Sequence, residues 1–182
     1  MKNLANYISL TRIALVPVII VLMMLDSSTE VMVTAFCIFV IAALSDFLDG
    51  YIARKTNTVS TIGKFLDLIA DKILQTAVII MLVANGTLIG NIEVTCVIVI
   101  ILRELFISAF RQIASANNVV IAADIFGKVK TVSNFICLSA LILATWQPFL
   151  IIGQIFLYIT TALSIISAVN YVIKNKQVMK NL

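Results

Sequence analysis

Four aspartates stand close together in a chain that is otherwise strongly apolar. Asp46 and Asp49 are three residues apart, and Asp67 and Asp71 are four residues apart. Residues at these spacings share one face of an α-helix, so two helices can each present a pair of carboxylates to one site. Carboxylate oxygens without histidine or cysteine partners suit a hard divalent cation such as Mg²⁺ or Mn²⁺. Four carboxylates are enough to hold two such ions for phosphoryl chemistry.

Small and basic residues accompany these acids. Gly50 and Gly63 lie beside them, and the absence of a side chain lets the phosphate or sugar of a ligand approach the backbone. The planar guanidinium of Arg54 can bind a phosphate oxygen. Together they predict a nucleotide site next to the metal site. The alternative is structural, with the glycines serving helix packing and the aspartates pairing with nearby cations. Those cations are Arg54, Lys55, Lys64 and Lys72.

The composition determines which elements must position these residues. The chain has 182 residues, of which 62% are hydrophobic and 12% charged, and its mean hydropathy is +1.12. A soluble domain of this size needs more charge on its surface, so we expect an integral membrane protein. Stretches of about 17 to 25 apolar residues can span a bilayer as helices. The fold class that we expect is all-α, a polytopic membrane protein whose single domain, 1–182, is a bundle of six transmembrane helices. The six stretches are 8–25, 31–53, 65–85, 92–114, 130–146 and 149–173.

Lysine and arginine are distributed unevenly among the loops between these stretches. The loops "DSSTE", "NGTLIGNIE" and "WQP" contain neither residue, whereas the alternate loops and both termini contain several. This asymmetry predicts cytoplasmic termini and an even number of spans in the cell membrane. It places the acidic site near the cytoplasmic surface. The net charge of +4 is therefore explained by topology and by attraction for anionic headgroups or phosphate substrates, without nucleic acid.

Two other residue types limit the chemistry. The chain contains no histidine, which excludes histidine-based catalysis and histidine metal ligands. Cys37, Cys96 and Cys137 fall inside predicted spans and lack the paired spacing of a metal site, so we expect them to be packing residues.

The acidic region resembles the signature of the CDP-alcohol phosphatidyltransferases, D-x-x-D-G-x-x-A-R, eight residues, then G-x-x-x-D-x-x-x-D. Here "DFLDGYIAR" is followed by "KTNTVSTI" and "GKFLDLIAD", and every fixed position matches. The resemblance covers essentially the whole chain, because the family core is also six membrane helices. The matching residues are Asp46, Asp49, Gly50, Ala53, Arg54, Gly63, Asp67 and Asp71.

The resemblance implies an activity and a role for each matching residue. The four aspartates would hold two divalent ions, Mg²⁺ or Mn²⁺, while Gly50, Arg54 and Gly63 would help to seat the CDP moiety. Asp71 would be the general base. The reaction would transfer a phosphatidyl group from CDP-diacylglycerol to an alcohol and release CMP, without a covalent enzyme intermediate. The resemblance also implies a homodimer among membrane lipids.

Three further segments bear on the acceptor alcohol. The segments "ANYISLTRIALVP", "LRELFISAFRQ" and "GKVKT" are similar to the bacterial branch of the family that uses glycerol 3-phosphate. This similarity implies that Arg103, Arg111, Lys128 and Lys130 bind the acceptor phosphate. As an alternative, Arg111, Lys128 and Lys130 are positive flanks of their spans, and Glu104 is a structural partner of Arg103.

Other functions stay open at this point. The same donor can serve another acceptor, namely inositol phosphate, serine or phosphatidylglycerol. A membrane cation carrier is a different class, but the chain has no internal repeat and its acids are confined to one depth. We expect 114–124 to be an ordered loop beside the site, and Asp124 has no assigned role.

Overall fold

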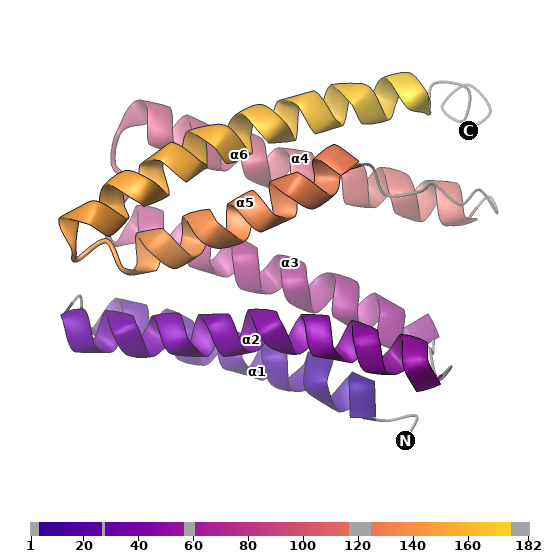
Figure 1. The fold of residues 1–182 in the computed structure, drawn as a ribbon, viewed down its shortest axis with the longest axis horizontal. Helices are drawn as coiled ribbons and strands as arrows, with labels where there is room; N and C mark the ends of the chain where they lie inside the picture. Colours follow the sequence, from indigo (N-terminus) through magenta and orange to yellow (C-terminus); the bar gives the residue numbers. More distant parts are fainter. Residues whose placement is uncertain (1–3, 27, 57–60, 117–124, 176–182) are drawn as a thin grey trace. The chain divides into compact units, whose positions relative to one another are not determined.

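The computed structural model describes the backbone of residues 4–26, 28–56, 61–116 and 125–175 (Figure 1). These residues form six α-helices and no strand, which confirms the all-α prediction for the described part of the chain. Side chains are described in 9–26, 28–45, 69–114 and 125–175. The helices are α1 (Leu4–Leu25), α2 (Thr29–Thr56), α3 (Thr61–Ala84), α4 (Asn91–Ala116), α5 (Ile125–Ile142) and α6 (Gln147–Lys174).

Helix α5 differs from the prediction of a span at 130–146. It begins at Ile125, five residues earlier, and it ends at Ile142, four residues earlier. The helix therefore extends beyond the predicted span at its start, where Lys130 was expected as a positive flank. The structure instead buries Lys130 within the helix, where its ammonium group contacts Glu104 of α4.

The early end of α5 has a local cause. The amide of Trp146 donates a hydrogen bond to the carbonyl of Leu143 at 3.1 Å, which closes a turn between α5 and α6. Pro148 stands in the first turn of α6, directly after Gln147. Proline lacks an amide hydrogen and fits the first turn of a helix but not its interior. The chain therefore starts a new helix there, although the residues on both sides are apolar.

Within the described residues, two helices are long and apolar enough to cross a membrane, α5 and α6. Shorter apolar helical stretches cover Ser9–Leu25 and Thr29–Ser45. Large apolar side chains are exposed along α6, among them Ile155, Ile159 and Ile166. Such a surface is expected where a helix meets lipid. These observations agree with a membrane protein, and the number of six spans stays a prediction.

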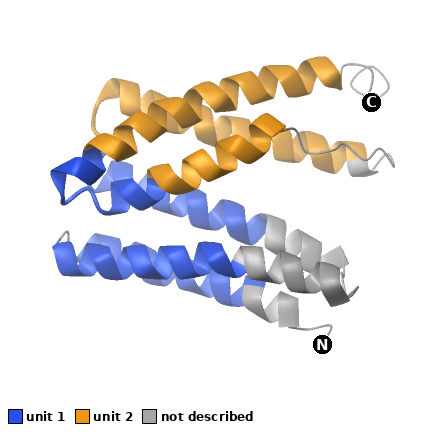
Figure 2. Ribbon diagram, in the orientation of Figure 1, with its two compact units in different colours: residues 1–88, 138–150 blue, residues 89–137, 151–182 orange. Residues whose placement is uncertain are grey.

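The chain divides into two compact units (Figure 2). The first unit contains 1–88 and 138–150, and the second contains 89–137 and 151–182. In the first unit, α1 packs against both α2 and α3, and α2 also contacts α3. The side-chain amide of Asn85 donates a hydrogen bond to the carbonyl of Met23 at 2.7 Å, which ties the end of α1 to the residue that follows α3.

The second unit is packed through small and hydroxyl side chains of α6. Its buried residues follow one another at intervals of three or four, which places them on one face. Small residues allow membrane helices to approach closely, and hydroxyl groups can bond across the contact. The hydroxyls of Ser133 in α5 and Thr160 in α6 lie 2.7 Å apart, which shows such a bond. The buried face of α6 consists of Gly153, Leu157, Thr160, Ser164, Ser167 and Tyr171.

The three cysteines are free and differ in their surroundings. Cys96 and Cys137 are buried, as the predicted packing role requires. The thiol of Cys137 donates to the carbonyl of Gly153 at 3.5 Å. Cys37 is exposed, so the prediction of a packing role is wrong for this residue. The buried face of α2 carries its neighbours Ala35 and Phe39, and a residue midway between them points elsewhere.

Candidate active site

The buried face of α2 leads directly to the first pair of aspartates. Its buried residues recur at intervals of three or four and end at Ala42, which is 0% exposed. The same interval continues to Asp46 and Asp49, which lie in α2 before its end at Thr56. The interval alone continues in the sequence to these two positions, whose side chains lie outside the described residues. The buried residues before them are Met32, Ala35, Phe39 and Ala42.

In α2 the predicted site residues follow the described buried residues, whereas in α3 Gly63 and Asp67 precede them. Its buried face includes Ala70, Leu74 and Val78, and counting back by three and then four residues gives Asp67 and Gly63. Because α2 and α3 contact each other and both pack against α1, the two aspartate pairs belong to adjacent helices of one unit. Only one predicted residue of this site, Asp71, has a described side chain. The side chains of Asp46, Asp49, Gly50, Arg54, Gly63 and Asp67 lie outside the described residues.

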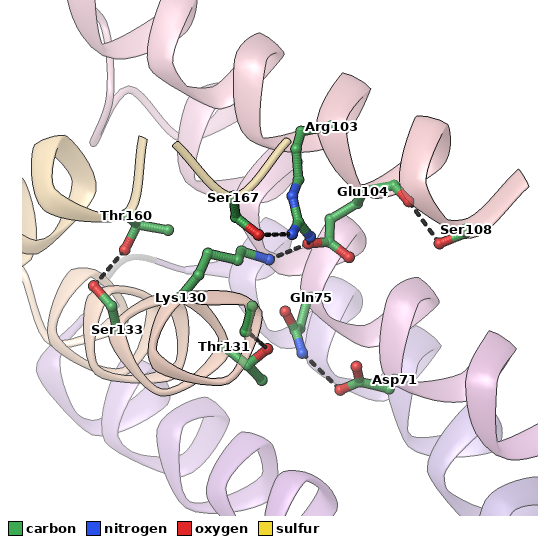
Figure 3. A network of polar contacts seen from close by, with 11 residues as sticks. Asp71, Gln75, Arg103, Glu104, Ser108, Lys130, Thr131, Ser133, Thr160 and Ser167 are labelled. Atoms are coloured by element: carbon green, nitrogen blue, oxygen red, sulfur yellow. Dashed lines mark hydrogen bonds and ion pairs between the residues drawn. The ribbon is translucent and has the colours of Figure 1, made fainter. Parts of the chain in front are cut away.

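Asp71 is partly buried and has a defined partner (Figure 3). Its Oδ1 accepts a hydrogen bond of 2.6 Å from Nε2 of Gln75, one helical turn later in α3. Gln75 was not among the predicted site residues, although the spacing of four residues is the signal for such a contact. A carboxylate has about four acceptor positions, so this amide bond orients Asp71 while using one of them.

The donor chemistry fits a divalent cation. Carboxylates from two adjacent helices provide only oxygen atoms, which Mg²⁺ and Mn²⁺ prefer. Asp71 is oriented by a hydrogen-bonding neighbour, as the ligands of protein metal sites usually are. Among the described side chains alone, no group of three or more histidine, cysteine, aspartate or glutamate residues can hold a metal ion. Three of the four aspartates are outside that set.

A cluster of charged and polar side chains lies inside the second unit (Figure 3). Oε1 of Glu104 accepts hydrogen bonds from Nη1 of Arg103 at 2.9 Å and from Nζ of Lys130. Nη2 of Arg103 donates to Oγ of Ser167 at 2.6 Å. The contact between Glu104 and Arg103 confirms the structural partner that the sequence suggested. The contact with Lys130 joins α4 to α5 across 26 residues of chain, and no local signal predicts it.

The electrostatics of this cluster favour an anionic ligand. The side chains of Arg103 and Lys130 are 10% and 2% exposed, and that of Glu104 is 23% exposed. Two cations and one carboxylate leave one net positive charge. Nε of Arg103 is buried and has no hydrogen-bond acceptor among the described residues. A buried donor without an acceptor costs about 1–3 kcal/mol, so a bound anionic oxygen at Nε would be stabilised.

The other two predicted acceptor residues lie elsewhere on their helices. Arg111 is exposed, and its guanidinium lies 5.5 Å from the centre of the Tyr171 ring. That ring is buried and also packs edge to face against Phe110. Lys128 is exposed in α5, and side chains two residues apart on a helix do not face the same side. The structure therefore brings Arg103 and Lys130 together through Glu104, but it does not bring Arg111 or Lys128 into that contact.

Two remaining predictions concern the segment between α4 and α5. Residues 117–124, which include Asp124 and most of the predicted loop at 114–124, lie outside the described residues.

Residues 2–166 match the family described as CDP-alcohol phosphatidyltransferase. The chain belongs to this family. Its sequence is 38% identical over 174 residues to a protein of Rickettsia bellii, with 93% of each chain covered. It is 36% identical over 195 residues to a protein of Bacillus subtilis, with 99% of this chain and 98% of the relative covered. Both relatives are named CDP-diacylglycerol–glycerol-3-phosphate 3-phosphatidyltransferase.

The family similarity extends beyond bacteria. A protein of Arabidopsis thaliana named CDP-diacylglycerol–glycerol-3-phosphate 3-phosphatidyltransferase 2 is 35% identical over 185 residues, with 94% of this chain and 79% of the relative covered. The resemblance that the aspartate motif indicated is confirmed, and so is membership over nearly the whole chain.

Proposed function

We propose that this chain transfers the phosphatidyl group of CDP-diacylglycerol to glycerol 3-phosphate, giving phosphatidylglycerophosphate and CMP in phospholipid biosynthesis. The observation that carries the proposal is the common name of the relatives that match the chain over most of its length. The basic cluster of the second unit supports a phosphorylated acceptor, because its three described charged residues have a net positive charge and Nε of Arg103 has no acceptor among the described residues.

In this proposal the aspartates and their neighbours bind the donor substrate. Asp46, Asp49, Asp67 and Asp71 hold two divalent cations, Mg²⁺ or Mn²⁺. When bound, these cations offset the charge of the diphosphate and make CMP a better leaving group. The CDP moiety is seated by Gly50, Arg54 and Gly63. The glycines admit the nucleotide close to the helix backbone, and the arginine binds a phosphate oxygen.

Asp71 acts as the general base. The acceptor hydroxyl oxygen forms a bond to the phosphorus that bears diacylglycerol, and the bond from that phosphorus to the CMP oxygen breaks. The hydroxyl proton passes to the carboxylate of Asp71. The hydrogen bond from Gln75 supports this role, because it holds one carboxylate oxygen and so limits rotation of the side chain.

The acceptor phosphate is bound by basic residues of α4 and α5. Arg103 and Lys130 provide the buried charge, and Nε of Arg103 donates to a phosphate oxygen. Arg111 and Lys128 are exposed and attract the anion as it approaches. Glu104 keeps Arg103 and Lys130 in place, because its carboxylate accepts a hydrogen bond from each of them.

The same proposal includes the membrane topology. We place all six helices across the cell membrane as one domain, with both termini and the active site on the cytoplasmic side. The alternation of basic and uncharged loops supports this orientation. Surrounding membrane lipids and a second copy of the chain are the expected partners.

An assay with single acceptors tests the proposed function. Purified protein in detergent micelles receives CDP-diacylglycerol with glycerol 3-phosphate, inositol phosphate, serine or phosphatidylglycerol, one at a time. We expect CMP release and a new lipid only with glycerol 3-phosphate. Lipid formation with a different acceptor would reassign the acceptor, and hydrolysis without transfer would contradict the proposal.

Arg103→Lys tests the acceptor pocket. Lysine keeps the charge but loses the planar fork and the Nε donor, so we expect the KM for glycerol 3-phosphate to rise about tenfold or more. The KM for CDP-diacylglycerol should change much less. The matched control is Gly127→Ala, because the added Cβ would lie 3.8 Å from both Nη2 of Arg103 and Oγ of Ser167, an ordinary contact. An equal rise in both KM values for Arg103→Lys would indicate a structural role instead.

A further inference from the structure

Arg12 is the largest fully buried side chain among those described in the first unit. It lies in α1 and is 1% exposed, and its Nε donates a hydrogen bond of 3.0 Å to the carbonyl of Ala42 in α2. By its charge and position, Arg12 belongs to the basic N-terminus of the chain, and it also lies in the segment "ANYISLTRIALVP". A flanking cation would extend to water or to lipid headgroups, because burying a guanidinium is costly unless the protein provides partners. The burial therefore points to a role inside the bundle.

The carbonyl that Arg12 contacts has an unusual set of donors. Oγ of Ser45 also donates to it, at 2.7 Å. The hydrogen-bond pattern of an α-helix assigns the same carbonyl to the amide of the residue four positions later, which is Asp46. Arg12 thus holds α2 at the peptide group to which the backbone of Asp46 is bonded. Asp46 lies about 6 Å further along the helix axis.

The packing of α1 extends this restraint to both acidic helices. Ser9, Arg12, Val16, Ile19 and Met23 are buried at intervals of three or four residues, so they form one interior face. Helix α1 packs against α2 and also against α3, which carries Asp67 and Asp71. A side chain anchored in α1 can therefore define how the first aspartate pair is oriented relative to the rest of the unit.

We propose that Arg12 is a positioning residue for the acidic site: its hydrogen bond to Ala42 fixes α2 one turn before Asp46 and so orients the first pair of carboxylates for cation binding. The inference rests on the proposed function in one respect, namely that Asp46 and Asp49 bind a divalent cation. Arg12 acts through the helix backbone and does not touch substrate. Residues that orient metal ligands typically change metal affinity about 10- to 100-fold when they are replaced.

The charge of Arg12 and its hydrogen bond to Ala42 are expected to change cation affinity in opposite directions, so substitutions can distinguish the two effects. A guanidinium near the site repels a divalent cation, so loss of its charge alone would strengthen cation binding. Loss of the hydrogen bond would weaken it. Arg12→Lys separates the two, because lysine keeps the charge but has a methylene carbon at the position of Nε. Arg12→Gln removes the charge as well.

Binding of Mn²⁺ to the purified full-length protein, without substrates, is the measurement. The electron paramagnetic resonance signal of free Mn²⁺ reports how much cation is bound. We expect Arg12→Lys to raise the Kd for Mn²⁺ about tenfold. The matched control, Ser45→Ala, removes the other side-chain donor to the same carbonyl and leaves Arg12 in place, so its Kd should stay close to that of the wild type.

The outcomes separate this inference from the proposed function. If the wild type shows no saturable Mn²⁺ binding that Asp46→Asn removes, the proposed metal site is wrong. If the wild type binds and Arg12→Lys binds equally well, Arg12 is not a positioning residue. Tighter binding by Arg12→Gln would mean that the residue acts through charge alone, and an equal loss in Ser45→Ala would indicate a general disturbance of α2. Unfolding of both Arg12 variants, seen as loss of a thermal transition, would make Arg12 a core residue and would also overturn the inference.

Discussion

Removal of divalent cations should abolish phosphatidyl transfer completely, and added Mg²⁺ or Mn²⁺ should restore it. The physical reason is the concentration of negative charge at the site. Four carboxylates in adjacent helices would repel one another and also the diphosphate of the donor, unless cations neutralise them. We therefore expect the largest effect of any single treatment. The measurement is CMP release in excess EDTA, followed by the same assay after the cation is returned.

A mutant provides the matched comparison for this treatment. Asp46→Asn should remain folded in detergent, because the amide has the same shape as the carboxylate, yet it should be inactive at every Mg²⁺ concentration. The metal hypothesis would be refuted by full turnover in excess EDTA. A different outcome would favour an ion pair that only stabilises the bundle. In that case Asp46→Asn would fail to fold, and activity would recover when Asp46 and its basic partner exchange positions.

Asp71→Asn should lower kcat by about 10²- to 10⁴-fold, which is the usual contribution of a general base. Asparagine keeps an oxygen that can accept the hydrogen bond from Gln75 and can act as a ligand, but it cannot take a proton. An isolated aspartate has a pKa of about 3.9 and is a weak base, so the acceptor hydroxyl must also be acidified at the site for proton transfer near neutral pH.

The measurement compares binding with turnover on the same purified proteins in saturating Mg²⁺. Binding of CDP to Asp71→Asn should stay closer to the wild type than its binding to Asp46→Asn. A kcat near the wild-type value would transfer the role of base to another group or to solvent. Loss of CDP binding as severe as in Asp46→Asn would reduce Asp71 to a metal ligand.

Local features of the sequence were sufficient to predict the helices and the family to which the chain belongs. Apolar runs predicted all six helices, and their observed boundaries differ by a few residues at most except at α5. The spacing of the aspartates predicted which residues share a helix face, because helical register depends only on neighbouring residues. The described side chains of α2 and α3 are buried at intervals of three or four residues, and the shared face of the aspartates stays a prediction.

Contacts between distant residues could not be derived in this way. Glu104 was expected beside Arg103, its neighbour in sequence, but its contact with Lys130 spans 26 residues. The bond from Arg103 to Ser167 spans 64 residues, and a single serine in an apolar helix gives no indication of its partner. Both contacts depend on which faces of the two helices meet. The packing of whole helices determines those faces.

Arg12 shows what the sequence predicts about a charged residue and what only the tertiary structure reveals. Its charge and its place near the N-terminus predicted a cytoplasmic flank, since a lone cation near the end of an apolar run normally reaches water. Only the tertiary structure showed that α2 presents the carbonyl of Ala42 to it and excludes solvent from the guanidinium. The sequence by itself determined the helices, the acidic motif and the family, because these depend on local spacing. The partners of the buried charges were decided by tertiary packing, because the cost of burying a charge depends on groups that only the fold brings near it.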